Sequence, residues 1–197
     1  MITLFNFDEF PVLTTDRLIL REIIDSDAND IFAIRGDYEV TKYNSGKAYT
    51  STKQAGDLIK SMSAAYDSKS ELRWGITISP GSTVVGMCGY DYWDHADNRA
   101  SIGFDLQRSC WRNGYMYEAL SAILNFGFIS MALNRIEVDT SIYNDASANL
   151  LRRLGFQQEG HQRQQYYEDN EYHDLLLFGL LSQEWQAIRE LNVVRVK

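Results

Sequence analysis

Apolar and polar residues alternate over several short stretches of this chain, and an alternation with period two is typical of β-strands. The pattern predicts strands at residues 17–23, 72–78, 84–93, 99–106 and 135–142. Two more strands are expected within residues 157–181, on either side of a polar turn at 168–170. Because the turns at 79–82 and 94–98 are short, the strands between 72 and 106 are expected to form an antiparallel meander.

Other segments carry apolar residues at helical spacing. The predicted helices are residues 25–35, a segment that begins at Ser51, residues 116–127, residues 144–156 and the tail from Ser182. Ser51 and Gln54 form a capping box, and Gly155 occupies the position that follows a helix end. Residues 37–49 have no core pattern and are expected to form a loop.

The order of these elements predicts an α/β (α+β) fold with a mixed sheet flanked by helices. The strand at 99–106, the long helix after it and the strand at 135–142 imply a crossover connection with parallel neighbours. The chain has 197 residues and shows no internal repeat or linker. We therefore expect a single domain over residues 1–197.

Composition narrows the classes of partner. A net charge of −8 argues against direct nucleic-acid binding, which needs a basic surface, and weakly favours cationic partners such as amines. The N-terminus lacks the basic region of a signal peptide, and the longest uncharged run, residues 119–133, is shorter than the roughly 20 residues of a membrane span. We expect a soluble cytoplasmic protein with two free cysteines and no membrane partner.

Residues 110–128 begin as a turn and continue as a helix. A turn signal at 112–114 follows the strand at 99–106, and helical spacing starts at Met116. A strand that turns through a glycine into a helix presents free backbone N–H groups and the positive end of a helix dipole. Phosphate groups bind at such places, so the phosphates of a cofactor are expected here.

Five stretches, taken in order, resemble the GNAT superfamily of acetyl-CoA-dependent N-acetyltransferases, and within it the branch that contains the ribosomal-protein N-terminal acetyltransferases. They are LTTDRLILRE at 13–22, ASIGFDL at 100–106, CWRNGYMYEAL at 110–120, RIEVDTSIYNDASANLLRRLGFQQEG at 135–160 and HDLLLFGLLSQEW at 173–185. The resemblance implies a strongly twisted mixed sheet of about six to seven strands. This sheet would splay between the strand that ends near Leu106 and the one that starts near Ile136.

The resemblance also implies that acetyl-CoA lies in this opening. Its pantetheine would pair with the strand edge at 103–106, which includes Phe104 and Leu106. Its pyrophosphate would sit on the N–H groups of the loop residues Arg112, Asn113, Gly114, Tyr115 and Met116. The loop departs from the family pattern at Arg112, usually a glycine, and at Met116, usually a small residue. Backbone donors survive both changes, but Met116 must point away from the phosphates, or the phosphates must sit differently.

Asn144 and Ser147 have two interpretations. By chemistry alone, Asn144 caps the helix at 144–156 and Ser147 is an exposed residue of its first turn. The resemblance implies instead that Asn144 contacts the cofactor arm near the thioester. It also implies that Ser147 donates a proton to the departing thiolate, as a general acid.

An acceptor ammonium must lose a proton before it attacks, so a base or a relayed water is required. The carboxylates considered are Asp91, Asp105 and Glu159, and Asp105 lies nearest the expected thioester in sequence. Its alternative role is that of a solvated acid at a strand end. Tyr166 stands where some relatives carry an acid, so the resemblance transfers no base to that position.

Two aromatic groups are candidate walls of an acceptor pocket: Tyr90, Tyr92 and Trp93 on a strand, and Tyr38, Tyr43 and Tyr49 in the expected loop. One face of the strand group is expected to be ordinary core. Glu118 is expected to interact with the helix dipole or to pack structurally. Covalent catalysis by Cys110 is discounted because no His–Cys arrangement is visible, and the three histidines have no metal-binding spacing.

The resemblance implies an N-acetyltransferase that moves acetyl from acetyl-CoA to a primary amine by direct attack in a ternary complex. Backbone N–H near Leu106 would stabilise the carbonyl oxygen. The expected acceptor is a protein N-terminal amine of the ribosomal-protein type. A small-molecule amine and a non-catalytic acyl-CoA binding or sensor module are the alternatives. The oligomeric state stays open, with a homodimer as one alternative.

Overall fold

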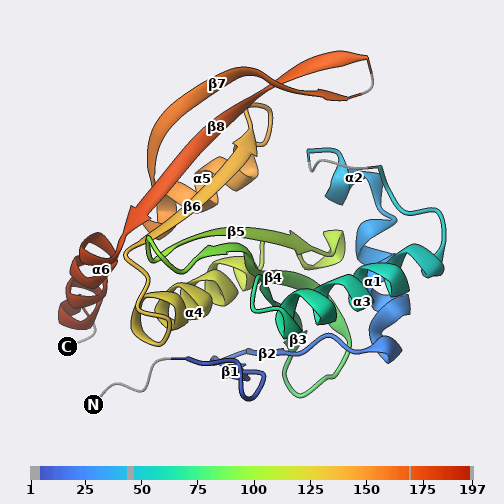
Figure 1. Ribbon diagram of the computed structural model, residues 1–197, viewed down its shortest axis with the longest axis horizontal. Coiled ribbons are helices and arrows are strands. Elements are labelled where there is room, and N and C mark those ends of the chain that lie inside the picture. The colour runs from blue at the N-terminus through green and yellow to red at the C-terminus, as the bar shows by residue number, and fades with distance from the viewer. Residues whose placement is uncertain (1–4, 44–46, 169, 196–197) are drawn as a thin grey trace.

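The structure of the chain is a computed structural model that describes residues 5–43, 47–168 and 170–195. In this part of the chain one mixed sheet runs in the order β1-β2-β3-β4-β5-β6-β8-β7 (Figure 1). The strands are β1 (Leu13–Thr14), β2 (Leu18–Arg21), β3 (Leu72–Ile78), β4 (Val84–Asp94), β5 (Arg99–Leu106), β6 (Arg135–Ser141), β7 (Gln157–Glu168) and β8 (Glu171–Leu181). Neighbours are antiparallel except β5 and β6, which run parallel as the crossover predicted.

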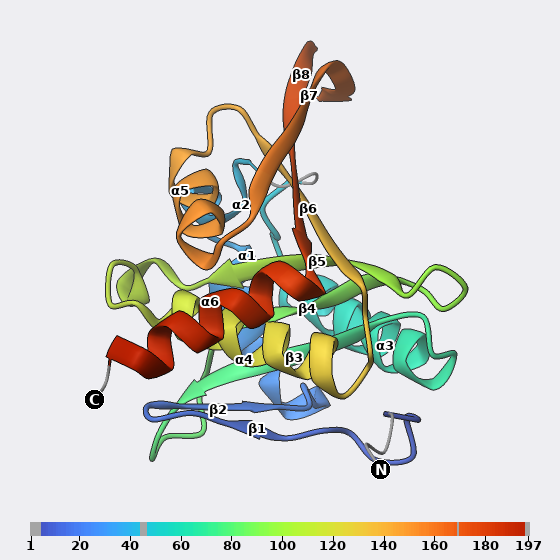
Figure 2. The same ribbon diagram turned by 90° about the vertical axis from the view of Figure 1, so that its left-hand side faces the viewer.

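Helices cover both faces of the sheet (Figure 2). They are α1 (Ala28–Arg35), α2 (Tyr38–Thr41), α3 (Thr52–Asp67), α4 (Tyr115–Ile129), α5 (Asp145–Leu154) and α6 (Ser182–Arg195). Alternation along β4 directs its side chains to two cores. Cys88 and Tyr90 join the larger core under α4, and Met87 joins the smaller core under α1 and α3. The predicted fold class, a helix-flanked mixed sheet, is confirmed.

The described residues form eight strands, one more than the upper limit of the predicted six to seven. The added strand, β1, has two residues, Leu13 and Thr14, which pair with Leu20 and Ile19 of β2. So short a strand carries no period of its own, and only its pairing with a neighbour reveals it.

The expectation of a loop at 37–49 is wrong at its start, where α2 forms one helical turn. Asp37 caps this turn, because its carboxylate accepts a hydrogen bond from the N–H of Glu39 at 2.9 Å. Residues 44–46 of the expected loop and residue 169 of the expected turn lie outside the described residues.

The ends predicted for α5 are confirmed: Asn144 caps its start, and Gly155 ends it at φ 98°.

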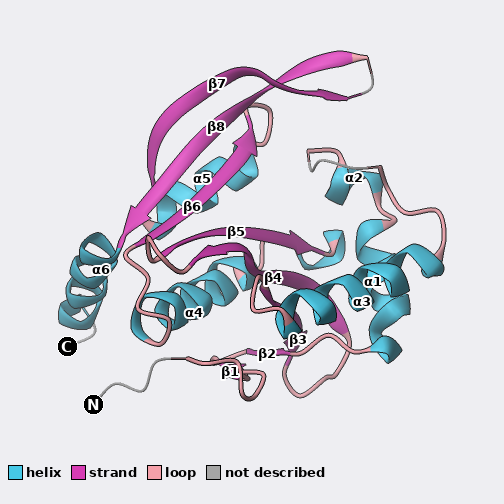
Figure 3. Ribbon diagram, in the orientation of Figure 1, coloured by secondary structure: helices cyan, strands magenta, loops and turns pink. Residues whose placement is uncertain are grey.

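The sheet opens between β5 and β6. The two strands pair only at Arg99–Arg135, Ala100–Ile136 and Ser101–Glu137, and then diverge as the resemblance implied. Beyond this point β6 continues beside β8, and the β7–β8 hairpin extends past the other strands (Figure 3). The remaining length of β5 therefore has a strand neighbour on one side only.

Close packing of α4 on the sheet yields a first test. The hydroxyl of buried Tyr90 donates to the carbonyl of Ile123, and a Cβ added at Gly127 would collide with that hydroxyl. We expect Gly127→Ala to lower the free energy of unfolding by about 1–3 kcal/mol through overpacking. Urea denaturation measures the change.

The matched control is Gly56→Ala on α3, where an added methyl group meets no atom within 4 Å. Since alanine favours a helix over glycine, this variant should gain roughly 0.5–1 kcal/mol. Equal effects of the two substitutions would contradict the packing described for α4.

Candidate active site

The turn that leads from β5 into α4 presents a row of free backbone donors. Gly114 adopts the left-handed conformation at φ 79° and stands immediately before α4, which has 15 residues. Among the described residues no acceptor faces the N–H groups of residues 112–117, since the first bond of this helix runs from Glu118 to Gly114. Free N–H groups at the positive end of a helix dipole suit the phosphates of a CoA molecule.

The two unusual side chains of this loop do not obstruct it. Met116 is only 7% exposed and packs into the larger core, so it points away from the row of donors. Arg112 is exposed, has a positive φ of 62°, and lines the adjoining cavity. The backbone donors are thus retained, and Arg112 adds a positive charge beside them.

An ion pair between two residues that are far apart in sequence holds this loop in place. Arg17 pairs with Glu118 of α4, with 2.7 Å between Nε and Oε2, and donates to the carbonyl of Asn113 at 3.0 Å. Thr15 and the N–H of Arg17 also donate to Glu118. Partial burial favours a higher pKa for Glu118, but these donors outweigh it and hold the pKa below its ordinary value. Glu118 is thus structural, one of its two expected roles.

Along the part of β5 that does not pair with β6, the backbone groups of every second residue point into the opening. Gln107 N–H donates to Val85 on β4, whereas the carbonyl of Leu106 accepts from the indole of Trp111 at 2.7 Å. Because strand residues direct N–H and C=O alternately to either side, Phe104 and Leu106 face the opening. These are the residues at which the resemblance placed the pantetheine.

The start of α5 borders the same opening. The side-chain oxygen of Asn144 accepts the N–H of Ser147 at 3.1 Å, which confirms the capping interpretation of Asn144. Ser147 itself is 8% exposed rather than exposed, so that part of the simpler interpretation is wrong. No described residue accepts or donates a hydrogen bond at its hydroxyl, which lines the opening.

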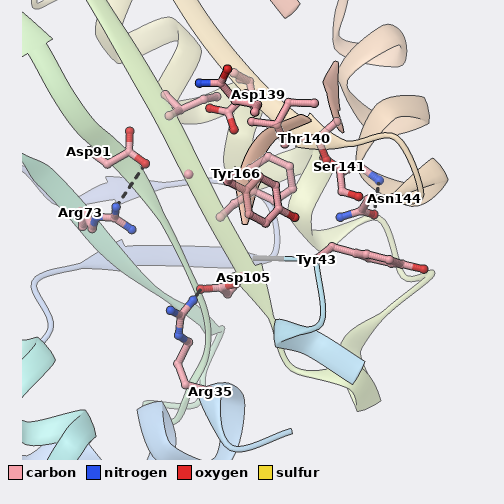
Figure 4. Close-up of a pocket in the computed structure, with 17 residues that line it drawn as sticks. Arg35, Tyr43, Arg73, Asp91, Asp105, Asp139, Thr140, Ser141, Asn144 and Tyr166 are labelled. Atoms are coloured by element: carbon pink, nitrogen blue, oxygen red, sulfur yellow. Dashed lines mark hydrogen bonds and ion pairs between the residues drawn. The ribbon is translucent and has the colours of Figure 1, made fainter. Parts of the chain in front are cut away.

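Two cavities meet at this point. One, of about 570 Å³, lies along the loop and α4, and the other, of about 480 Å³, lies between β5 and β6. They share five lining residues: Tyr43, Phe104, Asp105, Asn144 and Ser147. The first cavity contains the free backbone N–H groups that suit phosphates, and the second is lined by ionisable groups (Figure 4). The junction is where a group carried in the first cavity would meet a molecule held in the second.

All three carboxylates considered as the base are engaged in ion pairs, and two of them line the second cavity. Asp105 lies 2.7 Å from Arg35, and Asp91 pairs with Arg73 at 3.2 Å while accepting from the hydroxyl of Ser101. In an ion pair a carboxylate oxygen already accepts from a guanidinium, which leaves it less available to an approaching amine. Glu159 pairs with Arg135 and lines neither cavity.

Asp139 is the carboxylate that sequence reasoning missed. It lies on β6, faces the second cavity, and forms no ion pair with any described residue (Figure 4). Its side chain stays accessible from the cavity, yet partial burial, with the negative charge of Asp91, raises its pKa above the ordinary value. Its position in a strand of alternating pattern, VDTS, gave no signal beyond that of a solvated strand residue.

The aromatic candidates differ in whether they line a cavity. Tyr90 belongs to the core, and Tyr92 is half exposed outside both cavities. Tyr43 lines both cavities, and Tyr166 lines the second. Burial raises the pKa of the Cys88 thiol far above its usual range, and the Cys110 thiol, near the loop, lies 3.9 Å from the hydroxyl of Ser109.

The described residues include no group of three or more His, Cys, Asp or Glu able to hold a metal ion. No helix among them is long and apolar enough to cross a membrane.

The chain is similar to known acetyltransferases in sequence and in fold. A family model described as an acetyltransferase (GNAT) domain matches residues 17–157. The chain is 37% identical to the uncharacterized N-acetyltransferase YoaA of Bacillus subtilis over 172 residues, which cover 87% of this chain and 97% of that protein. It is 23% identical to the ribosomal protein uS5-alanine N-acetyltransferase of Escherichia coli over 182 residues, or 88% and 92% of the two chains.

A solved structure shares the fold. It is RimL, a ribosomal L7/L12 alpha-N-protein acetyltransferase in complex with coenzyme A, with a TM-score of 0.79 and 18% identity over 87% of this chain and 98% of that one. The match of the family model shows that this chain belongs to the GNAT acetyltransferases. The predicted activity class, an acetyl-CoA-dependent acyltransferase with an amine acceptor, is confirmed.

The ion pair at the loop yields a second test. Arg17→Met removes the hydrogen bond to the Asn113 carbonyl and the partner of Glu118. We expect the dissociation constant of CoA to rise about tenfold, the equivalent of one lost hydrogen bond to a charged group. Isothermal titration measures it.

Lys53→Met is the control, because it removes an exposed ion pair with Asp57 on α3, away from both cavities. A folded Arg17→Met protein that binds CoA as the wild type does would show that the loop needs no such anchor.

Proposed function

We propose that this enzyme acetylates the N-terminal amine of a protein, as the names of its ribosomal-protein relatives indicate for them. The observation that carries the proposal is the meeting of the two cavities at Asn144 and Ser147. One cavity offers free backbone N–H groups that suit phosphates, and the other offers the carboxylate of Asp139, which forms no ion pair with a described residue. The second cavity is not enclosed, which leaves room for a polypeptide that continues outside it. We also expect the reaction to occur in the cytoplasm, where ribosomal proteins are made.

Acetyl-CoA supplies an activated acetyl group, and the chain's residues bind and orient it. The N–H groups of residues 112–117 would hold its phosphates, with Arg112 beside them. The edge of β5 at Phe104 and Leu106 would pair with the pantetheine. The acetyl end then lies near Asn144 and Ser147, with the N–H of Leu106 available to the carbonyl oxygen.

Asp139 takes the role that sequence analysis gave to Asp105. A base must accept a proton as the acceptor amine attacks the thioester, and the carboxylate of Asp105 is already engaged with Arg35 at 2.7 Å. Asp139 forms no ion pair with a described residue, and its raised pKa favours acceptance of a proton. Asp105 would instead hold Arg35 in the cavity wall. Ser147 would donate a proton to the thiolate that leaves.

A panel of acceptors tests the substrate class. Free thiol released from acetyl-CoA should depend on peptides that carry a free N-terminal amine, and mass spectrometry should find the acetyl group on that amine. The same peptides with a blocked N-terminus and an internal lysine are the control. Turnover confined to small amines would favour the small-molecule alternative. Binding of CoA without thiol release from any amine would favour the non-catalytic module.

The pH profile tests Asp139. Asp139→Asn should lower kcat/KM by about 10²- to 10⁴-fold, the usual contribution of a positioned base. Both the base and the α-amine must be unprotonated, and the α-amine has a pKa of roughly 8. The logarithm of kcat/KM should therefore fall with slope two below both pKa values in the wild type, and with slope one in the variant.

Because the pKa of Asp139 is raised, the change from slope one to slope two in the wild-type profile should occur at a higher pH than the one at which an ordinary aspartate titrates. Glu137→Gln is the matched control on β6, since Glu137 pairs with Arg99 and Arg135 and lines neither cavity. An Asp139→Asn enzyme that keeps wild-type kcat/KM and slope two would remove Asp139 from this role.

A further inference from the structure

The β7–β8 hairpin contains an irregularity beside the second cavity. Gln162 pairs with Leu175, and the next pair is Tyr166 with His173. Three residues of β7, 163–165, therefore stand opposite Asp174 alone, which makes a bulge with two extra residues. Gln164, within the bulge, has a positive φ of 53°. Such a backbone conformation is costly for a residue other than glycine and persists only where its surroundings hold it.

The carboxylate of Asp174 holds this bulge from the opposite strand. Its Oδ1 accepts the N–H of Gln164 at 2.8 Å, and its Oδ2 lies 2.6 Å from Nε2 of His161. The hydrogen bond from Gln164, followed by the contact with His161, lowers the pKa of Asp174 below its ordinary value. One side chain of β8 thus contacts β7 both before the bulge and within it.

The last residue of the bulge and the residue after it form a wall of the cavity. Gln165 and Tyr166 line it opposite β5, and the ring of Tyr166 points into the space near Asp139 (Figure 4). Tyr166 stacks on His173 with 4.9 Å between ring centroids. Burial, then the charges of Glu168 and Asp139, raise the pKa of the Tyr166 phenol, so it stays a neutral hydrogen-bond donor. A regular hairpin would put residue 164, not Tyr166, opposite His173.

We propose that Asp174 is a positioning residue of the acceptor cavity, which acts by holding the bulge and thereby setting Gln165 and Tyr166 as the wall that contacts the amine substrate. The proposal rests on the proposed function, because the cavity must be the acceptor site. The first cavity contains none of these residues, so the effect should be confined to the amine and should spare acetyl-CoA.

Steady-state kinetics on Asp174→Ala and Asp174→Asn separate a positioning role from a general structural one. Asp174→Ala should raise the KM for the amine at least about tenfold, because small misplacements of a substrate-contacting group are costly. The KM for acetyl-CoA should stay within about twofold. Asp174→Asn should recover most of the loss, since its amide oxygen still accepts from Gln164. Tyr172→Ala, an exposed residue near the tip of the same hairpin that lines neither cavity, is the control.

Hydrogen exchange tests the same device without an acceptor. In the full-length wild type the Gln164 amide should be protected, and it should exchange at least about tenfold faster in Asp174→Ala and near the wild-type rate in Asp174→Asn. Unchanged exchange in the alanine variant would overturn the proposal, as would equal rises in both KM values. Absence of turnover by the wild-type enzyme with every amine would contradict the proposed function, and hydrogen exchange would then decide on the bulge alone.

Discussion

Three pairs of residues join β5 to β6, and the site depends on the fact that the pairing stops there. Buried backbone N–H and C=O groups need partners, so a strand that loses its neighbour must leave those groups to water or to a ligand. The same divergence brings the start of α4 and the start of α5 to one opening. Both cavities therefore follow from a single interruption of the sheet.

Charge in the opening is organised by pairing. Arg35 and Arg73 each pair with one carboxylate of the cavity, which leaves Asp139 as the acid of the cavity without an ion-pair partner among the described residues. A site that takes a proton from an attacking amine needs one such group with a raised pKa. Ion pairs that look merely structural thus decide which of several similar acids is available for chemistry.

The site has two ends, the loop before α4 and the wall at Tyr166. Residues distant in sequence hold the first end, and a neighbouring strand holds the second. Thr15 reaches Glu118 over 103 residues of chain, and with Arg17 it anchors the loop before α4. Asp174 holds the bulge that sets the wall at Tyr166. In each case a carboxylate collects several donors, so the geometry of a loop is determined by one side chain outside it.

The sequence by itself determined the strands longer than two residues, the longer helices, the turn through Gly114 and the family, because these features rest on local periodicity, caps and ordered motifs. It did not determine β1 or α2, which are too short to show a period. It also did not single out Asp139 as the acid of the cavity without an ion pair among the described residues, or the bulge opposite Asp174. Ion pairing, burial and register depend on which residues meet across the sheet, and only the tertiary structure brings Arg35 to Asp105 and leaves Asp139 unpaired.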